Sequence, residues 1–417
     1  MIPYVQWATL VWLTCALIIS LRRIKAGDRS TILLAFLVFY AFFALPLLYD
    51  LVLGSSSYLA EPGFVYAERD AAVNVIYGLF IALVPLIWSG FLRARKSRHF
   101  HTEEALRKLR RLRLPLVLLL FMPITLIWWA PDPAIYLKYA FVVTENLGRT
   151  VTDISQFHSY VMASSFIATI AGAGLVAGAK RPWRCLMLIA PFLAAAVWLN
   201  GKRTVLVMAV IMMMTGLWLS GRLRRRKMLI AVAVSVLLIG CFSYWYQLTV
   251  RDIGPSVVEN SDAYENFRVD YSRDSRVKMA IFAELHPSTM SILEFRGQSL
   301  IFYATAYIPR AIWPGKPLTY ACYFTSAMLG SSPQDWGWGM TTSIFDEALA
   351  NGSWLGLLAA SLVIGVLCRI GDSCSDDLVF LLTAIVASLL LTVELVAFAP
   401  LILIWVMMIV RAKVRFA

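Results

Sequence analysis

Charged residues and histidines are scarce in this sequence. Charged residues make up 15% of the 417 positions, hydrophobic residues make up 60%, and only four histidines occur. Soluble domains carry about 25% charged residues, so this composition excludes a soluble globular enzyme or binding domain.

Motifs that bind nucleotides, metal ions or disulfide partners are also missing. The sequence has no Walker loop and no dinucleotide-binding glycine pattern, which argues against a nucleotide-driven pump or a dehydrogenase. The six cysteines are scattered, and no cysteine and histidine spacing suits a zinc site. We therefore expect no disulfide framework, no metal ion and no other cofactor.

Long apolar segments dominate what is present. A membrane-spanning helix needs about 20 apolar residues. Segments of this kind lie near residues 2–21, 31–54, 71–92, 114–130, 158–179, 185–200, 204–220, 228–248, 354–370 and 378–411. The last is interrupted at Ala399-Pro400 and predicts two spans. The sequence thus predicts an all-α fold, a polytopic transmembrane helical bundle of about 10–11 spans.

Basic residues alternate between the two ends of these spans. Six segments hold 25 of the 38 lysines and arginines and only six acids: 22–29, 93–113, 180–184, 222–227, 369–377 and 411–415. Lysine and arginine collect on the cytoplasmic side of membrane proteins, so the N-terminus is predicted outside and the C-terminus inside. Because this asymmetry accounts for the net charge of +13, no nucleic-acid partner is expected.

One connection is far longer than the others. It divides the chain into a membrane bundle at 1–248, a large outer loop at 249–353 that contains short helices, and C-terminal spans at 354–417. Loops of this length are usually functional. The mixed charges of 251–278 predict a solvated surface that includes Arg268, Arg273 and Arg276. A short helix closes the loop, from a capping box at Ser343–Asp346 to a left-handed stop at Asn351-Gly352.

Two outer cations follow a tight hairpin between spans. Lys202 and Arg203 come directly after Gly201, against the general charge bias. Cations at a helix N-terminus oppose the helix dipole unless an anion binds there. Pairing with Asp252 or Glu259 is the structural alternative.

The proline-rich stretch 299–317 carries two more cations. Its apolar part, 299–308, is too short to span and is predicted to lie in the interface or to re-enter the membrane. Arg310 and Lys316 follow on a proline-stiffened turn, and Arg251 follows a span at the same predicted depth. Such cations predict a diphosphate clamp, because guanidinium groups offer paired donors. Anchoring to lipid headgroups is the other interpretation.

Four outer residues are candidates for a general base: Glu347, His286, Asp346 and Glu284. A base must reach the attacking hydroxyl, and Glu347 is preferred because a short helix fixes it at the membrane mouth. A capping or ion-pair role would explain Glu347 equally well. Glu394 lies in a late span, where an isolated charge is costly, and is expected to make an interhelical hydrogen bond.

The plan of the chain resembles the Wzy-type O-antigen polymerases, which join oligosaccharide repeat units of bacterial surface polysaccharides. The residues that carry the resemblance are Gly201-Lys-Arg-Thr204, Ile308-Pro-Arg-Ala-Ile-Trp-Pro-Gly-Lys-Pro317, Thr341-Thr-Ser343, Glu347 and Asn351-Gly-Ser-Trp-Leu-Gly356. Residues 1–190 match in architecture only.

This resemblance implies a GT-C-like fold in the bacterial inner membrane, with the long loop and the N-terminus in the periplasm. The substrates would be undecaprenyl-pyrophosphate-linked oligosaccharides, and the enzyme would be a metal-independent glycosyltransferase. Lys202, Arg203, Arg251, Arg310 and Lys316 would hold the diphosphate, and Glu347 or His286 would activate the acceptor. Membrane lipid, a chain-length regulator and a flippase are the other expected partners.

Two other functions remain open. An O-antigen ligase uses the same donor with a lipid A core acceptor and relies on a periplasmic histidine, for which His286 is the candidate. A lipid-linked oligosaccharide transporter is the second alternative, although the sequence shows no convincing internal repeat and places its charge in one outer loop.

Overall fold

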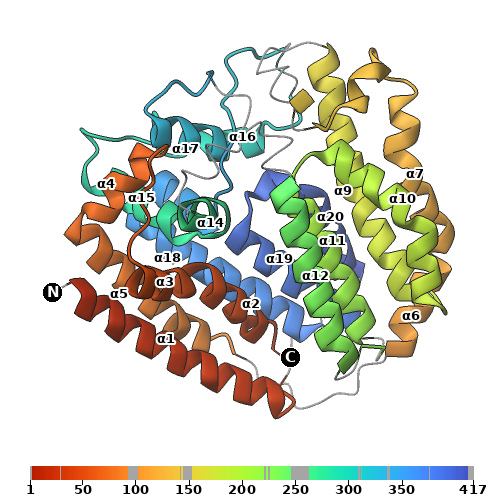
Figure 1. The fold of residues 1–417 in the computed structure, drawn as a ribbon, viewed down its shortest axis with the longest axis horizontal. Coiled ribbons are helices and arrows are strands. Elements are labelled where there is room, and N and C mark those ends of the chain that lie inside the picture. The colour runs from red at the N-terminus through yellow and green to blue at the C-terminus, as the bar shows by residue number, and fades with distance from the viewer. Residues whose placement is uncertain are drawn as a thin grey trace. The chain divides into compact units, whose positions relative to one another are not determined.

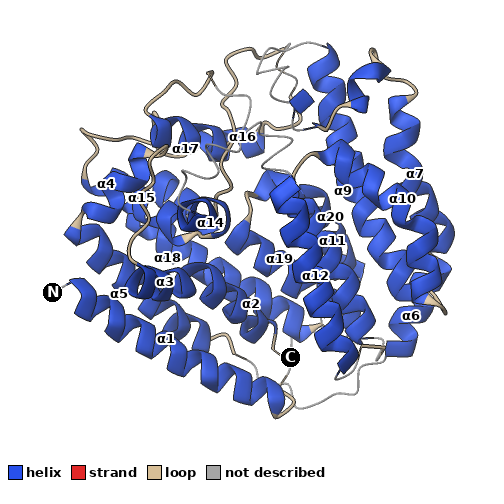
Figure 2. Cartoon of the chain, viewed as in Figure 1, coloured by secondary structure: helices blue, strands red, loops and turns tan. Residues whose placement is uncertain are grey.

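The protein is described from a computed structural model of its 417 residues (Figure 1). The described residues are 2–28, 30–92, 102–140, 142–143, 153–219, 222–223, 226–245, 263–308, 310, 312–335, 339–374 and 376–411. They form helices and loops and contain no strand (Figure 2). The prediction of an all-α chain is confirmed for these residues.

Six helical segments in the described part are long and apolar enough to cross a membrane: Tyr4–Lys25, Thr31–Leu53, Ala71–Ser89, Phe157–Gly178, Pro182–Asn200 and Ile344–Ser373. Shorter apolar helices lie at Arg113–Ile127, Val205–Met214, Asp377–Thr392 and Leu395–Arg411. Six of the predicted spans, near residues 2–21, 31–54, 71–92, 158–179, 185–200 and 354–370, correspond to the six long segments. The last apolar segment is interrupted after Thr392, a few residues before the predicted break at Ala399-Pro400. The protein is therefore embedded in a membrane by a bundle of helices.

The chain packs as two compact units. One contains Met1–Arg98 together with Glu259–Ala417, and the other contains His99–Val258. The first unit thus combines the N-terminal spans, the described part of the long loop and the C-terminal spans. These two units differ from the three segments predicted at 1–248, 249–353 and 354–417, because the long loop packs against helices from both ends of the chain.

In the unit of residues 99–258, α9 (Asp153–Gly178) lies against α7 (Arg113–Ile127), α10 (Pro182–Asn200) and α11 (Arg203–Leu219). Small residues allow this close approach: a Cβ atom at Gly216 would lie 2.6 Å from the Cβ of Ala177. The helices α6 (Thr102–Arg111) and α12 (Arg226–Trp245) belong to the same unit.

In the other unit, α1 (Ile2–Lys25) lies along α5 (Ala71–Ser89), and α2 (Thr31–Phe39) lies along α18 (Ile344–Ser373) and α19 (Asp377–Thr392). The helix α15 (Asp274–Leu285) contacts both α4 (Pro62–Arg69) and α18. This unit also contains α14 (Ala263–Tyr271), α16 (Gln298–Ala304), α17 (Tyr320–Leu329) and α20 (Ala399–Arg411). Pro400 occupies the first turn of α20, where its missing N–H costs nothing.

An irregular turn docks the long loop onto the membrane helices. A π-helical turn at Tyr40–Ala44 joins α2 to α3 (Leu45–Leu53), and Pro46 has no N–H to offer to the carbonyl of Phe42. That carbonyl accepts the backbone N–H of Arg273 at 3.0 Å. The carbonyl of Phe43 accepts the hydroxyl of Tyr77 at 2.7 Å. The first contact holds the start of α15 against the π-helical turn, and the second holds α5 (Ala71–Ser89) against it.

The helix α18 is broken at the position where the sequence predicts a stop. Gly352 has φ −129°, and Ser353, not Gly352, takes the positive φ of 55°, so the expectation of a left-handed glycine was wrong. The hydroxyl of Ser353 donates to Glu284, which holds this strained residue in place. Before the break, α18 carries Asp346 and Glu347; after it, the helix continues as an apolar span.

Candidate functional site

The charged stretch at the start of the loop helices is buried. Arg268, Arg276 and Lys278 are 0% exposed, and Arg273 is 3% exposed. The prediction of a solvated surface was therefore wrong for these residues. Alternating signs along the sequence reflected pairing inside the protein, and the partners come from other segments of the chain.

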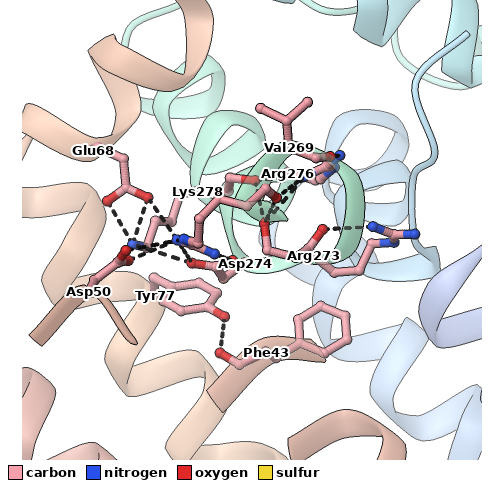
Figure 3. A network of polar contacts seen from close by, with 12 residues as sticks. Phe43, Asp50, Glu68, Tyr77, Val269, Arg273, Asp274, Arg276 and Lys278 are labelled. Carbon is pink, nitrogen blue, oxygen red and sulfur yellow. Dashed lines mark hydrogen bonds and ion pairs between the residues drawn. The ribbon is translucent and has the colours of Figure 1, made fainter. Parts of the chain in front are cut away.

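The centre of this charge cluster is Arg268. Its two terminal nitrogens donate to the carboxylate of Asp274 at 2.6 Å each, and its Nε and Nη2 donate to Asp50 at 3.1 and 2.8 Å. Lys278 donates to both oxygens of Glu68 at 2.9 and 2.8 Å. In Figure 3, Asp50, Glu68, Asp274 and Lys278 converge on one point between helices. The cluster ties α3 and α4 to α14 and α15.

The three carboxylates of this cluster are paired with two basic side chains. Oxygens of Asp50, Glu68 and Asp274 lie within 4.8 Å of one another, a spacing that suits a cation. Arg268 and Lys278 already supply two positive charges there. Burial alone would raise the pKa of Asp274, but the Arg268 guanidinium and its hydrogen bonds lower it to about 2. We therefore assign the cluster to ion pairing.

Arg273 and Arg276 hold the backbone of other segments. The guanidinium of Arg273 donates to the carbonyl of Thr392 at 2.8 Å, at the end of α19. Arg276 donates to the carbonyl of Thr341 at 3.2 Å and to that of Val269. Burial lowers the pKa of Arg276, yet an arginine stays protonated. Both buried guanidinium groups therefore stabilise the packing of α15: Arg273 binds the end of α19, and Arg276 binds the segment just before α18.

Glu347 is the preferred base of the sequence analysis, and it lies in a polar cluster of its own. Its side chain is in the first turn of α18 and is 8% exposed. Oε1 accepts the hydroxyl of Ser299 at 2.7 Å, and Oε2 accepts the hydroxyl of Tyr303 at 2.9 Å. Asn351 donates to Ser299 at 2.8 Å and to the carbonyl of Glu347 at 2.8 Å. No ion pair of Glu347 occurs among the described residues.

Phe345 fixes the turn that carries Glu347. Its ring meets those of Phe39, Phe43 and Phe80 edge to face, with centroids 6.1, 5.4 and 5.1 Å apart. Edge-to-face packing of this kind is favourable. The first turn of α18 is thus anchored in an aromatic core built from the N-terminal spans.

The neighbouring acids have structural contacts. Asp346 closes the predicted capping box, in which its Oδ1 accepts the N–H of Ser343 at 2.8 Å. Its Oδ2 is buried and has no hydrogen-bond partner within the described part of the chain. Glu394 accepts the N–H of Ala321 at 3.0 Å, in the first turn of α17. Glu394 lies in the break after α19 and not within a spanning helix as predicted, but the expected hydrogen bond to another helix is present. Its charge suits a helix N-terminus.

The two loop cations of the predicted clamp bind backbone carbonyls. Arg310 donates to the carbonyls of Lys316 and Pro317 at 2.6 and 2.7 Å. Lys316 donates to the carbonyls of Ala306 and Ile308 at 3.1 and 3.0 Å, just after α16. Burial lowers the pKa of Lys316. These contacts give both cations a role in closing the loop that the sequence analysis did not foresee, while their part in binding phosphate stays a prediction.

His286 and Glu284, the other candidate bases, lie at the end of α15. His286 Nε2 is 2.9 Å from Oδ2 of Asp70, and its side chain is 42% exposed. Asp70 caps the N-terminus of α5, and the N–H of Val73 lowers the pKa of that carboxyl. Glu284 pairs with Arg296 at 2.9 Å. His286 therefore belongs to an accessible histidine–carboxylate pair.

The predicted cations of the second unit are described only in part. Gly201 has φ 73° and ends α10 in the left-handed conformation that the hairpin requires. Lys202 is exposed. The side chain of Arg203 and all of Arg251 lie outside the described residues. The diphosphate clamp therefore stays a prediction.

Sequence reasoning missed Ser299, Tyr303 and Asn351 as partners of Glu347. A signal was present, because Ser299 and Tyr303 are four residues apart, as are Glu347 and Asn351, and this spacing places each pair on one helix face. Nothing in the sequence indicated that the two pairs meet. No family model, no curated protein and no solved structure matches this chain.

Proposed function

We propose that this protein is a glycosyltransferase of the bacterial inner membrane that joins undecaprenyl-pyrophosphate-linked oligosaccharide repeat units, as Wzy-type polymerases do. The helical membrane bundle supports this proposal, and so does the long loop that packs against the spans of its unit. The resemblance at residues 201–204 and 308–356 supplies the reaction.

In the proposed reaction, a sugar hydroxyl of one lipid-linked unit attacks the anomeric carbon of the chain carried by another. The new glycosidic C–O bond forms as the bond from that carbon to the diphosphate breaks. Undecaprenyl pyrophosphate leaves with the electron pair, and Glu347 accepts the proton of the hydroxyl. The free energy comes from the diphosphate linkage, so no nucleotide is consumed.

The observation that carries this proposal is the carboxylate of Glu347 at the head of α18. It lies just before the break that precedes the apolar span, on a turn fixed by Phe345. Its oxygens accept hydroxyl hydrogen bonds, and no cation pairs with it among the described residues. A carboxylate that is not neutralised by a cation can take a proton from a substrate hydroxyl.

Diphosphate binding is assigned to the predicted cations as part of the proposal. Charge on the leaving group needs stabilisation, which fixed donors supply. Lys202 and Arg203 stand at the N-terminus of α11, where the helix dipole also favours an anion. Arg251, Arg310 and Lys316 are the further candidates.

Deletion of the gene tests the proposed function in the cell. If the protein is a polymerase, the deletion strain should make lipopolysaccharide with a single repeat unit on each core and without long chains. The wild-type gene should restore the ladder of chain lengths, and the Glu347→Gln variant should not. A normal ladder in the deletion strain would contradict the proposal.

An O-antigen ligase is the second candidate, and His286 favours it. The histidine is paired with Asp70 at 2.9 Å and is accessible, an arrangement that fits a proton acceptor. The same deletion strain separates the two functions, because loss of a ligase leaves the core without any repeat unit.

A further inference from the structure

The short helix α16 has an inverted distribution of polar and apolar residues. Ser299 is 0% exposed, while its neighbours Leu300 and Ile301 are 56% and 38% exposed. An ordinary surface helix buries its apolar residues and exposes its polar ones. The inward polar face of α16 therefore requires a partner, and that partner is the carboxylate of Glu347.

The direction of each hydrogen bond in this cluster is determined by the chemistry of the groups. Nδ2 of Asn351 is 2.8 Å from the carbonyl oxygen of Glu347, which only accepts, so the nitrogen of the amide must lie there. The same nitrogen donates to the hydroxyl oxygen of Ser299 at 2.8 Å. The hydroxyl of Ser299 can accept this bond and still donate its own proton to Oε1 of Glu347, 2.7 Å away, because an ionised carboxylate only accepts.

Tyr303 completes the set from the next turn of α16. Its hydroxyl donates to Oε2 of Glu347 at 2.9 Å. Burial, together with the charges of Glu347 and Glu394, raises the pKa of Tyr303. The phenol therefore keeps its proton and remains a donor throughout the physiological pH range. Both oxygens of the carboxylate thus accept a hydroxyl from the same helix.

We propose that Ser299, Tyr303 and Asn351 are positioning residues that fix the carboxylate of Glu347 and favour its ionised form. This inference rests on the proposed function, in which Glu347 is the base. Hydrogen bonds to a carboxylate favour its charged state, and two donors on one rigid helix also fix its direction.

The two hydroxyl donors act against the surroundings of Glu347, which disfavour the negative charge of its carboxylate. The ionisable groups that act on Glu347 are Glu394, Tyr303 and Asp346. Two of them are acids, and burial adds to their effect. The hydroxyls of Ser299 and Tyr303 oppose this effect, because each of them donates a hydrogen bond to an oxygen of the carboxylate. Loss of either hydroxyl should therefore raise the pH at which the base works, and Asn351 contributes by orienting the hydroxyl of Ser299.

The test is the pH dependence of chain lengthening by purified protein supplied with lipid-linked repeat units. Tyr303→Phe and Ser299→Ala each remove one hydroxyl and should lower the rate about ten- to a hundredfold at neutral pH. The acid limb of the pH–rate profile should move to higher pH by about one unit. The loss should fall on kcat rather than on KM. Ser299→Thr keeps the hydroxyl and should restore the profile.

Tyr320→Phe is the matched control. Tyr320 is also a buried tyrosine, but its hydroxyl donates to the carbonyl of Asp346 at 3.0 Å and not to Glu347. This variant should keep the wild-type pH profile. If Tyr303→Phe and Ser299→Ala also keep it, the positioning role is wrong, even where Glu347→Gln is inactive and the proposed function stands.

A second readout needs no substrate and therefore separates this inference from the proposed function. Infrared difference spectra between the wild-type protein and Glu347→Gln report the carboxylate of Glu347 as the pH changes. In the Tyr303→Phe background the carboxylate signal should appear at higher pH. An unchanged titration would overturn the inference. Absence of chain lengthening by the wild-type protein, with the titration shifted as expected, would overturn only the proposed function.

Discussion

The guanidinium of Arg268 meets the carboxylate of Asp274 in two parallel hydrogen bonds of 2.6 Å, and both side chains are fully buried. The same guanidinium reaches Asp50 on α3, 218 positions earlier in the chain. The long loop is thus fastened to the N-terminal spans by charge. This fastening places α15 beside the turn that carries Glu347.

Removal of Arg268 is expected to destabilise the protein strongly. Arg268→Ala leaves the buried carboxylates of Asp274 and Asp50 without their main partner, and loss of one member of a buried pair costs about 3–5 kcal/mol. Arg296→Ala is the control, because the Arg296–Glu284 pair is exposed on the arginine side and worth little. Thermal unfolding in detergent, followed by size-exclusion chromatography, measures both. Equal stability of the two variants would contradict an anchoring role of the cluster.

The same pair predicts an acid-sensitive stability. The pKa of Asp274 is lowered to about 2 in the folded protein, against about 3.9 in an unfolded chain. A lowered pKa stabilises the fold above the unfolded value and loses this effect as the pH falls through the folded value. About 2–3 kcal/mol should therefore be lost between roughly pH 5 and pH 1.

The Asp274→Asn variant tests that sign. It should be less stable than the wild-type protein at neutral pH, and its stability should depend less on acidification over the same window. A wild-type-like slope in Asp274→Asn would assign the acid sensitivity to other carboxylates.

Membrane topology is the next prediction. The basic segment 93–113 should be cytoplasmic and the loop 249–353 periplasmic, because lysine and arginine favour the cytoplasmic side. Alkaline phosphatase is active only outside the cytoplasm. Fusions at Lys108 should therefore be inactive and fusions at Ser331 active. The reverse pattern would invert the whole arrangement and move Glu347 to the cytoplasmic side.

Sequence reasoning recovered the features that are local in the chain. The spans follow from continuous apolar segments, the capping box from Ser343 and Asp346, and the hairpin from Gly201. Each of these depends on residues within a few positions of one another. Glu394 was also placed correctly in a hydrogen bond, because a buried carboxylate must find a donor.

Long-range pairing could not be predicted in the same way. The charges around Arg268 read as a solvated surface, because their partners Asp50 and Glu68 lie about 200 positions away in the chain. The carbonyls that Arg310 and Lys316 bind carry no signal in the sequence, since every residue has one. The structure therefore corrects the predicted roles of the loop cations more than it corrects the predicted helical bundle.

The predicted diphosphate ligands can be tested one at a time. Arg203→Ala and Arg310→Ala should each abolish chain lengthening while the protein still reaches the membrane. Lysine at either position should rescue only partly, because it keeps the charge but lacks the paired donors. For Arg310 the carbonyls of Lys316 and Pro317 also lose a partner, so membrane levels must be measured alongside activity. Full activity of both alanine variants would exclude these residues as ligands, and full rescue by lysine would reduce their role to charge alone.

The most direct test of the proposed reaction is chain lengthening by the purified protein in the presence of EDTA. Undecaprenyl-pyrophosphate-linked repeat units are the only substrates supplied, and product length is read on a gel. The proposed mechanism predicts that chains lengthen in EDTA, that magnesium adds little, and that Glu347→Gln produces none, because side-chain cations stabilise the leaving group and Glu347 accepts the proton. Activity that disappears with the chelator and returns with one particular metal ion would contradict it, as would full activity of Glu347→Gln.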